Sequence, residues 1–523
     1  MTRSRLWDIG ILLLAGGILI FFNLGGMPLL DPDEPVYAQT AKEMLAQHSY
    51  ISPRIFGDFW YDKPPMYYWL VMLSSQFFGL TDFAARFPSA ILAILSSIVL
   101  YLFICDIFNR RVAFFSSLIL LSSLGFFYLG KAAVTDITLM FFLMTSMLAL
   151  LRKNYYLFYA CMGFAVLTKG PIGFFPGVIG LAYFLVSGRM SELRQAKLFS
   201  GLLLAFAVFS PWYGAMSYLH GNDFVDTFLG FHNLTRFSSP EHPGRNIWYF
   251  YMPVLLIGFF PWCTILLQAG YRSLTHASKY ASPLLFMNLW ALLVFLFFSA
   301  AQTKLVSYIL PMYPAISVLV GWYIYDLLDG YGLPERPYGW IAGLFVLTIG
   351  FCYGVWTGLK EFAGTEMSSF LLIFVFLFLG VFSLYFLWKR QLQNALVLHV
   401  LGMIAFSLTI SGVLFPVIAP QFSSRAIATE FKQMYDQQPV YIAKFLRPGF
   451  AFYSDIYGKE AGEAGNIEKI LKDESSADSW FILRETDYER LSAFSKNQLE
   501  LVKKVDNNMI LKKAVTVPEA LAQ

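Results

Sequence analysis

Three carboxylates fall within four residues of the chain. They are Asp31, Asp33 and Glu34, in the string Leu-Leu-Asp-Pro-Asp-Glu-Pro-Val-Tyr that starts at Leu29. Carboxylates are side chains that accept protons in general base catalysis. Polar residues are costly to keep near a membrane, so their clustering in a chain this apolar indicates function. The alternative is a solvated loop in which Asp33 only caps the helix that follows it.

The same segment ends with a second polar string, Trp-Tyr-Asp-Lys-Pro-Pro at residues 60–65, where Asp62 stands beside Lys63.

The composition predicts that the helices which position both strings lie in a bilayer. Of the 523 residues, 57% are hydrophobic and only 14% are charged, which is too apolar for a soluble protein of this length. No basic tract suited to nucleic acid appears. The four cysteines lie in apolar runs at no metal-ligand spacing, so we expect no disulfide framework and no zinc site.

Apolar runs that approach the roughly 20 residues needed to cross the hydrocarbon occur along most of the chain. The first follows Arg3 and Arg5 without a convincing cleavage site before Leu24, so we expect a retained helix and not a signal peptide. The sequence predicts thirteen spans, near residues 7–24, 84–105, 112–129, 136–151, 155–168, 171–187, 197–215, 247–267, 282–300, 306–327, 338–358, 368–389 and 394–416.

Cations are distributed unevenly over the predicted loops. With the N-terminus in the cytoplasm, the short inner segments hold fourteen Lys and Arg residues and the four short outer loops hold one each. This bias predicts an inner N-terminus and an outer C-terminus. The long loops 25–83 and 216–246 then share the outer face. The spans hold almost no ionisable residue apart from His399, which favours chemistry at the outer surface over an ion-coupled transport path.

The loop 25–83 contains two segments that we expect to be interfacial helices, Glu34–Gln47 and Pro65–Phe78. After Pro420 the chain becomes charged, with strand-like runs at Val440–Phe445, Ser479–Arg484 and Leu499–Val505 and a helix-like stretch at Asp487–Ser495. The expected fold class is therefore an α-helical integral membrane protein over residues 1–420, followed by a small α/β domain on the outer face over residues 421–523.

Three strings together resemble one family of enzymes. They are Pro32-Asp33-Glu34-Pro-Val-Tyr37-Ala38, then Tyr61-Asp62-Lys63-Pro64-Pro65 with Tyr68-Trp69, and Thr303-Lys304-Leu305 to Tyr308-Ile-Leu-Pro311 with Tyr313-Pro314. The family is the GT-C glycosyltransferases that use polyprenyl-phosphate sugars, in particular the bacterial lipid A 4-amino-4-deoxy-L-arabinose transferases. The protein O-mannosyltransferases are its eukaryotic relatives. The resemblance covers roughly the whole membrane region and implies a GT-C architecture and a transfer that inverts the anomeric carbon.

The resemblance implies that the departing group is a lipid phosphate, whose growing negative charge needs cations at the membrane surface. Tyr308 could donate its hydroxyl to the same phosphate. The alternative is that the cations only anchor loops at the level of the lipid headgroups. The predicted donor-phosphate-binding residues are Lys63, Lys169, Arg236, Lys304 and Tyr308.

Asp33 matches the favoured catalytic carboxylate of the family. It would accept a proton from an acceptor hydroxyl. If the acceptor is an ionised phosphate, Asp33 would instead position the donor sugar or stabilise positive charge at its anomeric carbon. Glu34 is expected to be an adjacent helper. Asp136 resembles a second family carboxylate, with a plain helix N-cap as the alternative.

The resemblance also selects Tyr37, Asp62 and His232 as residues of the substrate loops. His232 could hydrogen-bond the donor phosphate or, with Asp62, bind a divalent ion. Two ligands are few for a metal site and one phosphate does not require a metal, so we expect neither a metal nor another cofactor. The chain departs from the aminoarabinose transferases in two places. It has Pro35-Val36 where they usually carry Thr-Arg, and Asp62 where they tend to carry Glu.

The expected function is transfer of a sugar from polyprenyl (undecaprenyl) phosphate to lipid A or another envelope glycolipid, on the periplasmic side of the inner membrane. The expected partners are the lipid-linked donor, the glycolipid acceptor and membrane lipids, with no nucleic acid. The departures from the family put the sugar and the acceptor in question more than the reaction. Transfer to a protein Ser or Thr, transport or flipping of lipid-linked sugars, and a structural scaffold are the alternatives.

Overall fold

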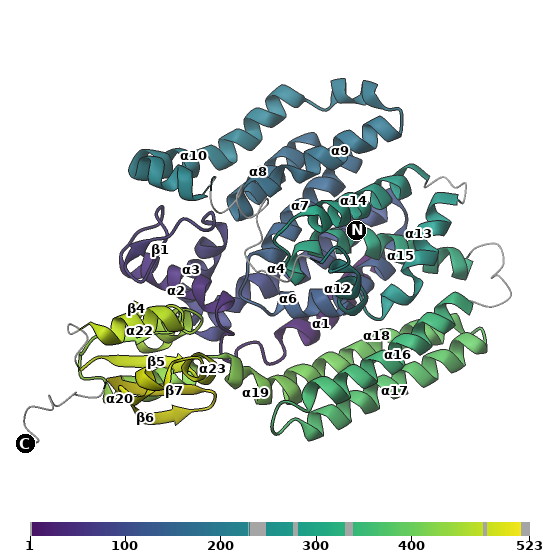
Figure 1. Cartoon of the computed structure of the whole chain (residues 1–523). Coiled ribbons are helices and arrows are strands. Elements are labelled where there is room, and N and C mark those ends of the chain that lie inside the picture. The colour runs from purple at the N-terminus through teal and green to yellow at the C-terminus, as the bar shows by residue number, and fades with distance from the viewer. Residues whose placement is uncertain are drawn as a thin grey trace, which may run out of the picture. The chain divides into compact units, whose positions relative to one another are not determined.

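The computed structural model describes residues 3–228, 230, 247–275, 281–329, 338–473 and 478–513. Figure 1 labels their helices and strands. Internal contacts divide the chain into two compact units. The first holds residues 1–24, 61–70 and 86–414, and the second holds residues 25–60, 71–85 and 415–523. Most of the first outer loop, all but residues 61–70, therefore groups with the C-terminal segment, although the two are far apart in the sequence.

The first unit is mostly helical, because a helix bonds its backbone polar groups internally, as a bilayer requires. Its helices are α1 (Arg3–Gly16), η1 (Gly17–Phe21), most of α4 (Asp82–Ile107), α5 (Arg110–Ser122), α6 (Leu124–Gly130), α7 (Asp136–Leu151), α8 (Tyr155–Lys169), η2 (Gly170–Phe174), α9 (Phe175–Val186), η3 (Met190–Gln195), α10 (Leu198–Val225), α12 (Tyr251–Gly258), η5 (Trp262–Ile265), α13 (Leu266–Thr275), α14 (Ala281–Ala300), η6 (Val306–Met312), α15 (Tyr313–Asp329), α16 (Tyr338–Leu359), α17 (Glu366–Trp388), α18 (Leu392–Thr409) and η7 (Ile410–Leu414).

Within the described residues, nine helices are long and apolar enough to cross a membrane. The number rises to eleven if each of two bent pairs is one span. The α5–α6 pair bends by 66°, and Tyr251–Gly258 meets Trp262–Thr275 at 110°. The second bend corrects the prediction of one continuous span over 247–267. The many apolar helices are confirmed, and their number of thirteen stays a prediction.

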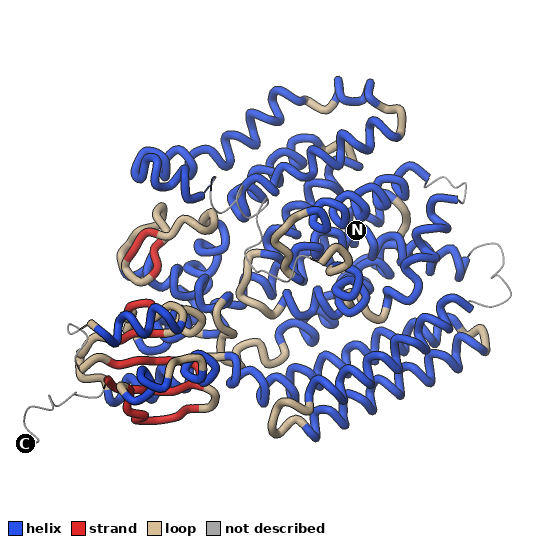
Figure 2. The backbone as a smooth tube through the Cα atoms, viewed as in Figure 1, coloured by secondary structure: helices blue, strands red, loops and turns tan. Residues whose placement is uncertain are grey.

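Small residues let the helices of the first unit approach closely. A Cβ on Gly201 of α10 would lie 1.9 Å from the ring of Tyr159 on α8, so only glycine fits at this crossing. Helices α16, α17 and α18 pack side by side (Figure 2). Helix α10 reaches Val225 across a break at Gly221, where φ is 56° and ψ is −136°, so residues 216–220 and 222–225, predicted to open the second outer loop, are helical.

One ionisable group lies inside the first predicted span. Asp8 of α1 is 5% exposed and accepts hydrogen bonds from Tyr101 at 2.6 Å and from Nε and Nη2 of Arg110 at 2.6 and 2.7 Å. In the second span, Arg86 is 2% exposed and donates to the Leu24 carbonyl at 3.2 Å. The expectation that the spans hold almost no ionisable residue apart from His399 was therefore wrong. Both groups are paired locally, as burial of a charge requires.

The second unit begins with α2 (Asp33–Ala46), the hairpin of β1 (Arg54–Ile55) and β2 (Asp58–Phe59), and most of α3 (Met66–Phe78). Both helices confirm the segments predicted as helical, and their place at the membrane interface stays a prediction. The hairpin was not predicted. Glu43 of α2 holds its turn, because its carboxylate accepts from the backbone N–H groups of Phe56 and Gly57 at 2.7 and 2.9 Å.

The C-terminal part of the second unit is a five-stranded mixed sheet of order β4-β3-β5-β7-β6 with helices around it (Figure 2). Its core is apolar, and side chains of α20, α21 and α22 pack on the strands. The elements are α19 (Phe415–Ile418), η8 (Ala419–Phe422), α20 (Arg425–Met434), β3 (Val440–Ile442), α21 (Arg447–Ser454), β4 (Lys459–Glu460), α22 (Ala464–Lys472), β5 (Trp480–Arg484), α23 (Glu485–Glu489), α24 (Ala493–Asn497), β6 (Leu499–Val505) and β7 (Asn508–Lys513).

The three strands predicted here are present as β3, β5 and β6. Strands β4 and β7 were not predicted. The helix expected over Asp487–Ser495 is instead two short helices, α23 and α24. Ser492 starts the second of them by accepting a hydrogen bond from the Ser495 N–H, which separates the two helices.

Candidate active site

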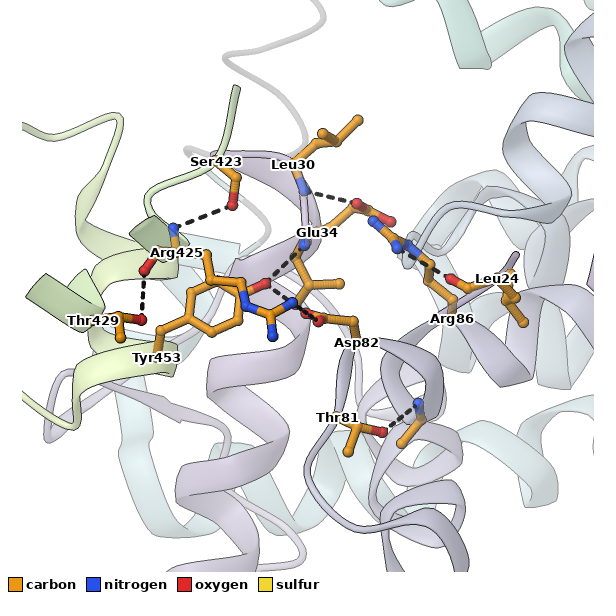
Figure 3. Close-up of polar contacts among 12 residues, drawn as sticks. Leu24, Leu30, Glu34, Thr81, Asp82, Arg86, Ser423, Arg425, Thr429 and Tyr453 are labelled. Atoms are coloured by element: carbon orange, nitrogen blue, oxygen red, sulfur yellow. Dashed lines mark hydrogen bonds and ion pairs between the residues drawn. The ribbon is translucent and has the colours of Figure 1, made fainter. Parts of the chain in front are cut away.

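The three neighbouring carboxylates at the start of α2 differ in how deeply they are buried. Asp31 and Glu34 are 8% and 4% exposed, whereas Asp33 is exposed. Glu34 reaches back to accept a hydrogen bond from the Leu30 N–H at 2.8 Å (Figure 3), as a carboxylate in a first helical turn often does. Of the three, Asp33 is thus the carboxylate that an incoming substrate can reach.

The alternative that Asp33 is the N-cap of this helix was wrong. Helix α2 begins at Asp33, the N-cap position belongs to Pro32, and no side chain caps the helix there. A carboxylate in the first turn still interacts favourably with the helix dipole. Tyr37 lies one turn further along α2 and is half-buried. Residues four apart share a helix face, so Asp33 and Tyr37 can face one substrate.

Asp31 has a structural partner in the C-terminal segment. Its Oδ2 accepts from the Ser424 N–H at 2.6 Å, and its own N–H donates to the Phe422 carbonyl at 2.9 Å. Burial raises the pKa of Asp31 from the ordinary 3.8 to about 8. The hydrogen bond from Ser424 opposes this rise because it favours the charged form.

The first unit holds a separate cluster of charged residues. Asp136, the first residue of α7, pairs with Lys169 at the end of α8, with Nζ and Oδ1 2.8 Å apart. The two side chains are 11% and 17% exposed. The Lys169 ammonium also lies 4.9 Å from the centre of the Tyr308 ring in η6. Thr135 occupies the N-cap position of α7, so the N-cap alternative for Asp136 was wrong.

Asp62 and Lys63 join this cluster. Lys63 Nζ lies 2.9 Å from Asp62 Oδ1, with the side chains 15% and 14% exposed. The negative charge of Asp62 also acts on Lys169, together with that of Asp136. The structure therefore brings five of the predicted residues together in one unit: Asp62, Lys63, Asp136, Lys169 and Tyr308.

Lys304 lies in the connection between α14 and η6 and is 3% exposed. Its ammonium donates to the carbonyls of Ser299 and Ala301, where α14 ends. Burial lowers the pKa of this ammonium. These contacts complement the carbonyl end of a helix, and the role of Lys304 in phosphate binding stays a prediction.

His232 and Arg236 lie outside the described residues, so their predicted roles rest on the sequence alone. The suggested metal-binding pair of Asp62 and His232 also rests on the sequence alone, because His232 is one of its two members. Within the residues that the structure describes, no group of three or more His, Cys, Asp or Glu side chains could hold a metal ion. The expectation of no metal stays a prediction.

One polar network around the start of α2 was missed by the sequence. Asp82, at the start of α4, accepts from Tyr453 at 2.5 Å and pairs with Arg425 at 3.1 Å (Figure 3). Tyr453 also accepts from the Leu29 N–H at 2.8 Å. No motif links these positions, which are hundreds of residues apart. The signal that could have drawn notice to Asp82 is a carboxylate directly before a long apolar run.

Four of the five clustered residues, all but Tyr308, fall within the range that a family model matches. Residues 62–214 match the model of the dolichyl-phosphate-mannose-protein mannosyltransferase family. The chain is 32% identical over 337 residues to the undecaprenyl phosphate-alpha-4-amino-4-deoxy-L-arabinose arabinosyl transferase of Aeromonas hydrophila, a match over 61% of this chain and 60% of that protein. It is 27% identical over 453 residues to an uncharacterized protein of Aquifex aeolicus, which covers 84% and 85% of the two chains. The chain thus spans less than two thirds of the arabinosyl transferase.

Solved structures share the fold over almost the whole chain. ArnT from Cupriavidus metallidurans matches with a TM-score of 0.77 when bound to undecaprenyl phosphate and 0.80 in the apo state, at 20% identity. The matches cover 98% of this chain and 98% and 99% of those chains. These similarities confirm the GT-C fold expected from the loop motifs. In sequence and in fold, the chain resembles the GT-C glycosyltransferases that use polyprenyl-phosphate sugars.

Proposed function

We propose that the protein is an inverting glycosyltransferase of the inner membrane. It moves a sugar from undecaprenyl phosphate, or a related polyprenyl phosphate, to lipid A or another envelope glycolipid. We place the N-terminus in the cytoplasm and the reaction on the periplasmic side, as the distribution of cations supports. The names of the relatives support the donor class. The resemblance of the loop motifs to those of the lipid A aminoarabinose transferases supports a glycolipid acceptor.

One observation carries this proposal. Asp62, Lys63, Asp136, Lys169 and Tyr308 gather in one unit from separate parts of the chain. Two lysines and a phenol provide the charge and the donor that a departing phosphate needs. The carboxylates hold those lysines at fixed positions before substrate binds, and such preorganised charge is what stabilises a transition state.

The proposed reaction breaks one bond and forms one. An acceptor oxygen attacks the anomeric carbon on the face opposite the phosphate, and the carbon–oxygen bond to that phosphate breaks. The bonding electrons leave with the polyprenyl phosphate, and Lys63 and Lys169 stabilise its added negative charge. We assign the role of Asp33 from the sequence motif alone: when the acceptor is a hydroxyl, its proton goes to Asp33. When the acceptor is a phosphate already ionised, Asp33 stabilises positive charge at the anomeric carbon.

Transfer to a protein Ser or Thr is a second candidate, because the matching family model is that of protein mannosyltransferases. The two candidates differ in how the acceptor arrives. A glycolipid enters from the bilayer, and a peptide enters from water. Transport or flipping of lipid-linked sugars has less support. The charged side chains of the cluster form ion pairs with one another, whereas a transport path needs polar groups along the membrane spans.

The reaction class is tested with purified protein in detergent or nanodiscs. The donors are undecaprenyl-phosphate-linked aminoarabinose and mannose, each offered with lipid A or with a Ser/Thr-rich peptide. Chromatography follows the release of undecaprenyl phosphate and the gain of a sugar mass on the acceptor. Acceptor-dependent release by the wild type and none by Asp33→Asn is the expected result. A wild-type protein that leaves every donor intact, while lipid-linked sugar crosses liposome membranes, would establish transport.

A further inference from the structure

We propose that Tyr453 of α21 is a positioning residue for Asp33, and that the C-terminal segment holds the start of α2 in place through it. This inference rests on the proposed function, because it takes Asp33 as the catalytic carboxylate. Tyr453, Asp82, Leu29 and Asp33 all belong to the second unit. The C-terminal segment then acts on the reaction through the position of Asp33.

The Tyr453 hydroxyl stands between two groups of the first outer loop. It accepts a hydrogen bond from the Leu29 N–H at 2.8 Å and donates one to Asp82 Oδ1 at 2.5 Å. Leu29 is fully buried and Asp82 is 8% exposed. Arg425 holds the other oxygen of Asp82 at 3.1 Å, and its guanidinium lies 5.7 Å from the Tyr453 ring centre (Figure 3). The Tyr453 hydroxyl thus acts as both donor and acceptor, and these two hydrogen bonds fix its orientation.

Asp31 provides a second tie between the same two segments. Its backbone N–H donates to the Phe422 carbonyl, and its carboxyl accepts from the Ser424 N–H, which stands just before α20. The two ties lie four and two residues before Asp33. The backbone entering α2 is therefore held on both sides of Leu30, so the position of Asp33 follows from the position of the C-terminal segment.

Lys42 provides a third tie, further along α2. Its ammonium donates to the Phe452 carbonyl at 2.7 Å and pairs with Asp455 at 2.6 Å. Phe452 and Asp455 flank Tyr453 in the chain. Helix α2 and the residues just before it are thus bound to α21 and the residue after it at two points, Leu29 and Lys42, which are thirteen residues apart. These contacts fix the direction of the helix axis as well as its start.

The contacts at Leu29, Asp31 and Lys42 matter because Asp33 is exposed and its position depends on them. The position of a side chain in a first helical turn follows the backbone that carries it, and a displacement of about 1 Å at a reacting group can cost about 100-fold in rate. Replacing Tyr453 by Phe removes the hydroxyl and leaves the ring. The Leu29 N–H then loses its acceptor in a buried place, and the start of α2 gains freedom.

The test compares Tyr453→Phe with Tyr441→Phe, a matched control on β3. The Tyr441 ring stacks on Phe481 with centroids 5.2 Å apart, and within the described residues its hydroxyl makes no hydrogen bond. Hydrogen exchange on the full-length protein, read by mass spectrometry, follows peptides that cover residues 29–40. We expect faster exchange there in Tyr453→Phe and unchanged exchange in Tyr441→Phe. Unchanged exchange in Tyr453→Phe overturns the inference whether or not the protein transfers sugar.

Kinetics separate positioning from a structural role. We expect kcat to fall about 10- to 100-fold in Tyr453→Phe, with KM for the lipid-linked donor close to wild type. A lower thermal midpoint with an unchanged kcat of the folded protein would show a structural role only. If Tyr453→Phe does not fold, Asp82→Asn is measured in the same way, because it weakens the same link. A wild type without transfer activity refutes the proposed function, and hydrogen exchange then still decides the inference.

Discussion

Residues that are adjacent in the chain have different environments at the start of α2. Asp31 is buried against Ser424, Glu34 is buried against its own backbone, and Asp33 between them is exposed. The sequence predicted the cluster, because the motif and the helix start coincide, and the catalytic role of Asp33 stays a prediction. It could not predict the partner of Asp31, since nothing in the local sequence indicates a contact with residue 424.

Asp31 makes folding depend on pH. Its folded-state pKa of about 8 lies above the ordinary 3.8, so the folded protein holds a proton that the unfolded chain releases between these values. The stabilising contribution is complete below about pH 4 and is lost as the pH rises to about 8, at about 1.4 kcal/mol per pKa unit. Asp31→Asn keeps an acceptor for the Ser424 N–H and removes the charge. We expect it to raise the thermal midpoint at pH 8 more than at pH 5.

Thermal unfolding in detergent across pH 4–9 measures this effect. Asp58→Asn, an exposed carboxylate of the β1–β2 hairpin, is the matched control and should leave the pH profile as in the wild type. Identical profiles for Asp31→Asn and the wild type would show that Asp31 is ionised in the folded protein at neutral pH.

The Asp136–Lys169 pair allows its structural and chemical roles to be separated. Lys169→Met leaves a carboxylate without its partner in a poorly solvated place, which costs about 3–5 kcal/mol for a buried pair. Asp136→Asn combined with Lys169→Met removes both charges and should recover most of this stability. We expect neither variant to transfer sugar, because the leaving phosphate has lost a cation.

Thermal unfolding and the transfer assay together measure both roles. Lys153→Met breaks the more exposed pair with Glu192, in which the lysine side chain is 55% exposed, and should cost less than about 1 kcal/mol. Transfer restored in the double variant would contradict the role of Lys169 in phosphate binding.

At the scale of elements, apolar runs and turn residues predicted most helices within a few residues. The helices at 33–46 and 66–78 are examples, because an acidic start or a proline pair marks their first turns. The β1–β2 hairpin could not be predicted in this way. Its turn depends on Glu43, a residue of another element that holds two backbone N–H groups. The break at residues 259–261 was also missed, since the run across it is uniformly apolar.

The crossing of α8 and α10 depends on one glycine. A Cβ at Gly201 would overlap the Tyr159 ring, whereas a Cβ at Gly214 of the same helix meets nothing within 4 Å. We expect Gly201→Ala to destabilise the protein by about 1–3 kcal/mol through overpacking. Gly214→Ala should be neutral or stabilise by up to about 1 kcal/mol through helix propensity. Thermal midpoints in detergent compare the two variants, and equal midpoints would contradict this packing.

At the scale of the whole molecule, the sequence predicted a membrane domain and a following α/β segment. It did not predict that most of the first outer loop and the C-terminal segment form one unit. Composition and periodicity describe what each stretch becomes, and they contain no information on which distant stretches pair. The contacts of Tyr453, Arg425 and Ser424 with that loop provide this missing information.

The predicted topology places the C-terminal segment outside and the loop before α10 inside. Single cysteines at Glu500 and Ser191, both exposed, report on these two places. A membrane-impermeant maleimide should label Glu500→Cys in spheroplasts and should label Ser191→Cys only after the membrane is opened. The wild type, with its own four cysteines, gives the background. The reverse pattern would place the proposed reaction in the cytoplasm.

The most direct test of sugar transfer is a mass spectrum of lipid A and total glycolipids. It compares cells that carry the wild type, Asp33→Ala or no protein. We expect a sugar-sized mass increase on lipid A or another envelope glycolipid with the wild type only, and polyprenyl-phosphate sugar accumulating in the other two. A glycolipid profile that is the same with Asp33→Ala as with the wild type, and different without the protein, would contradict catalysis by Asp33 and return transport to consideration.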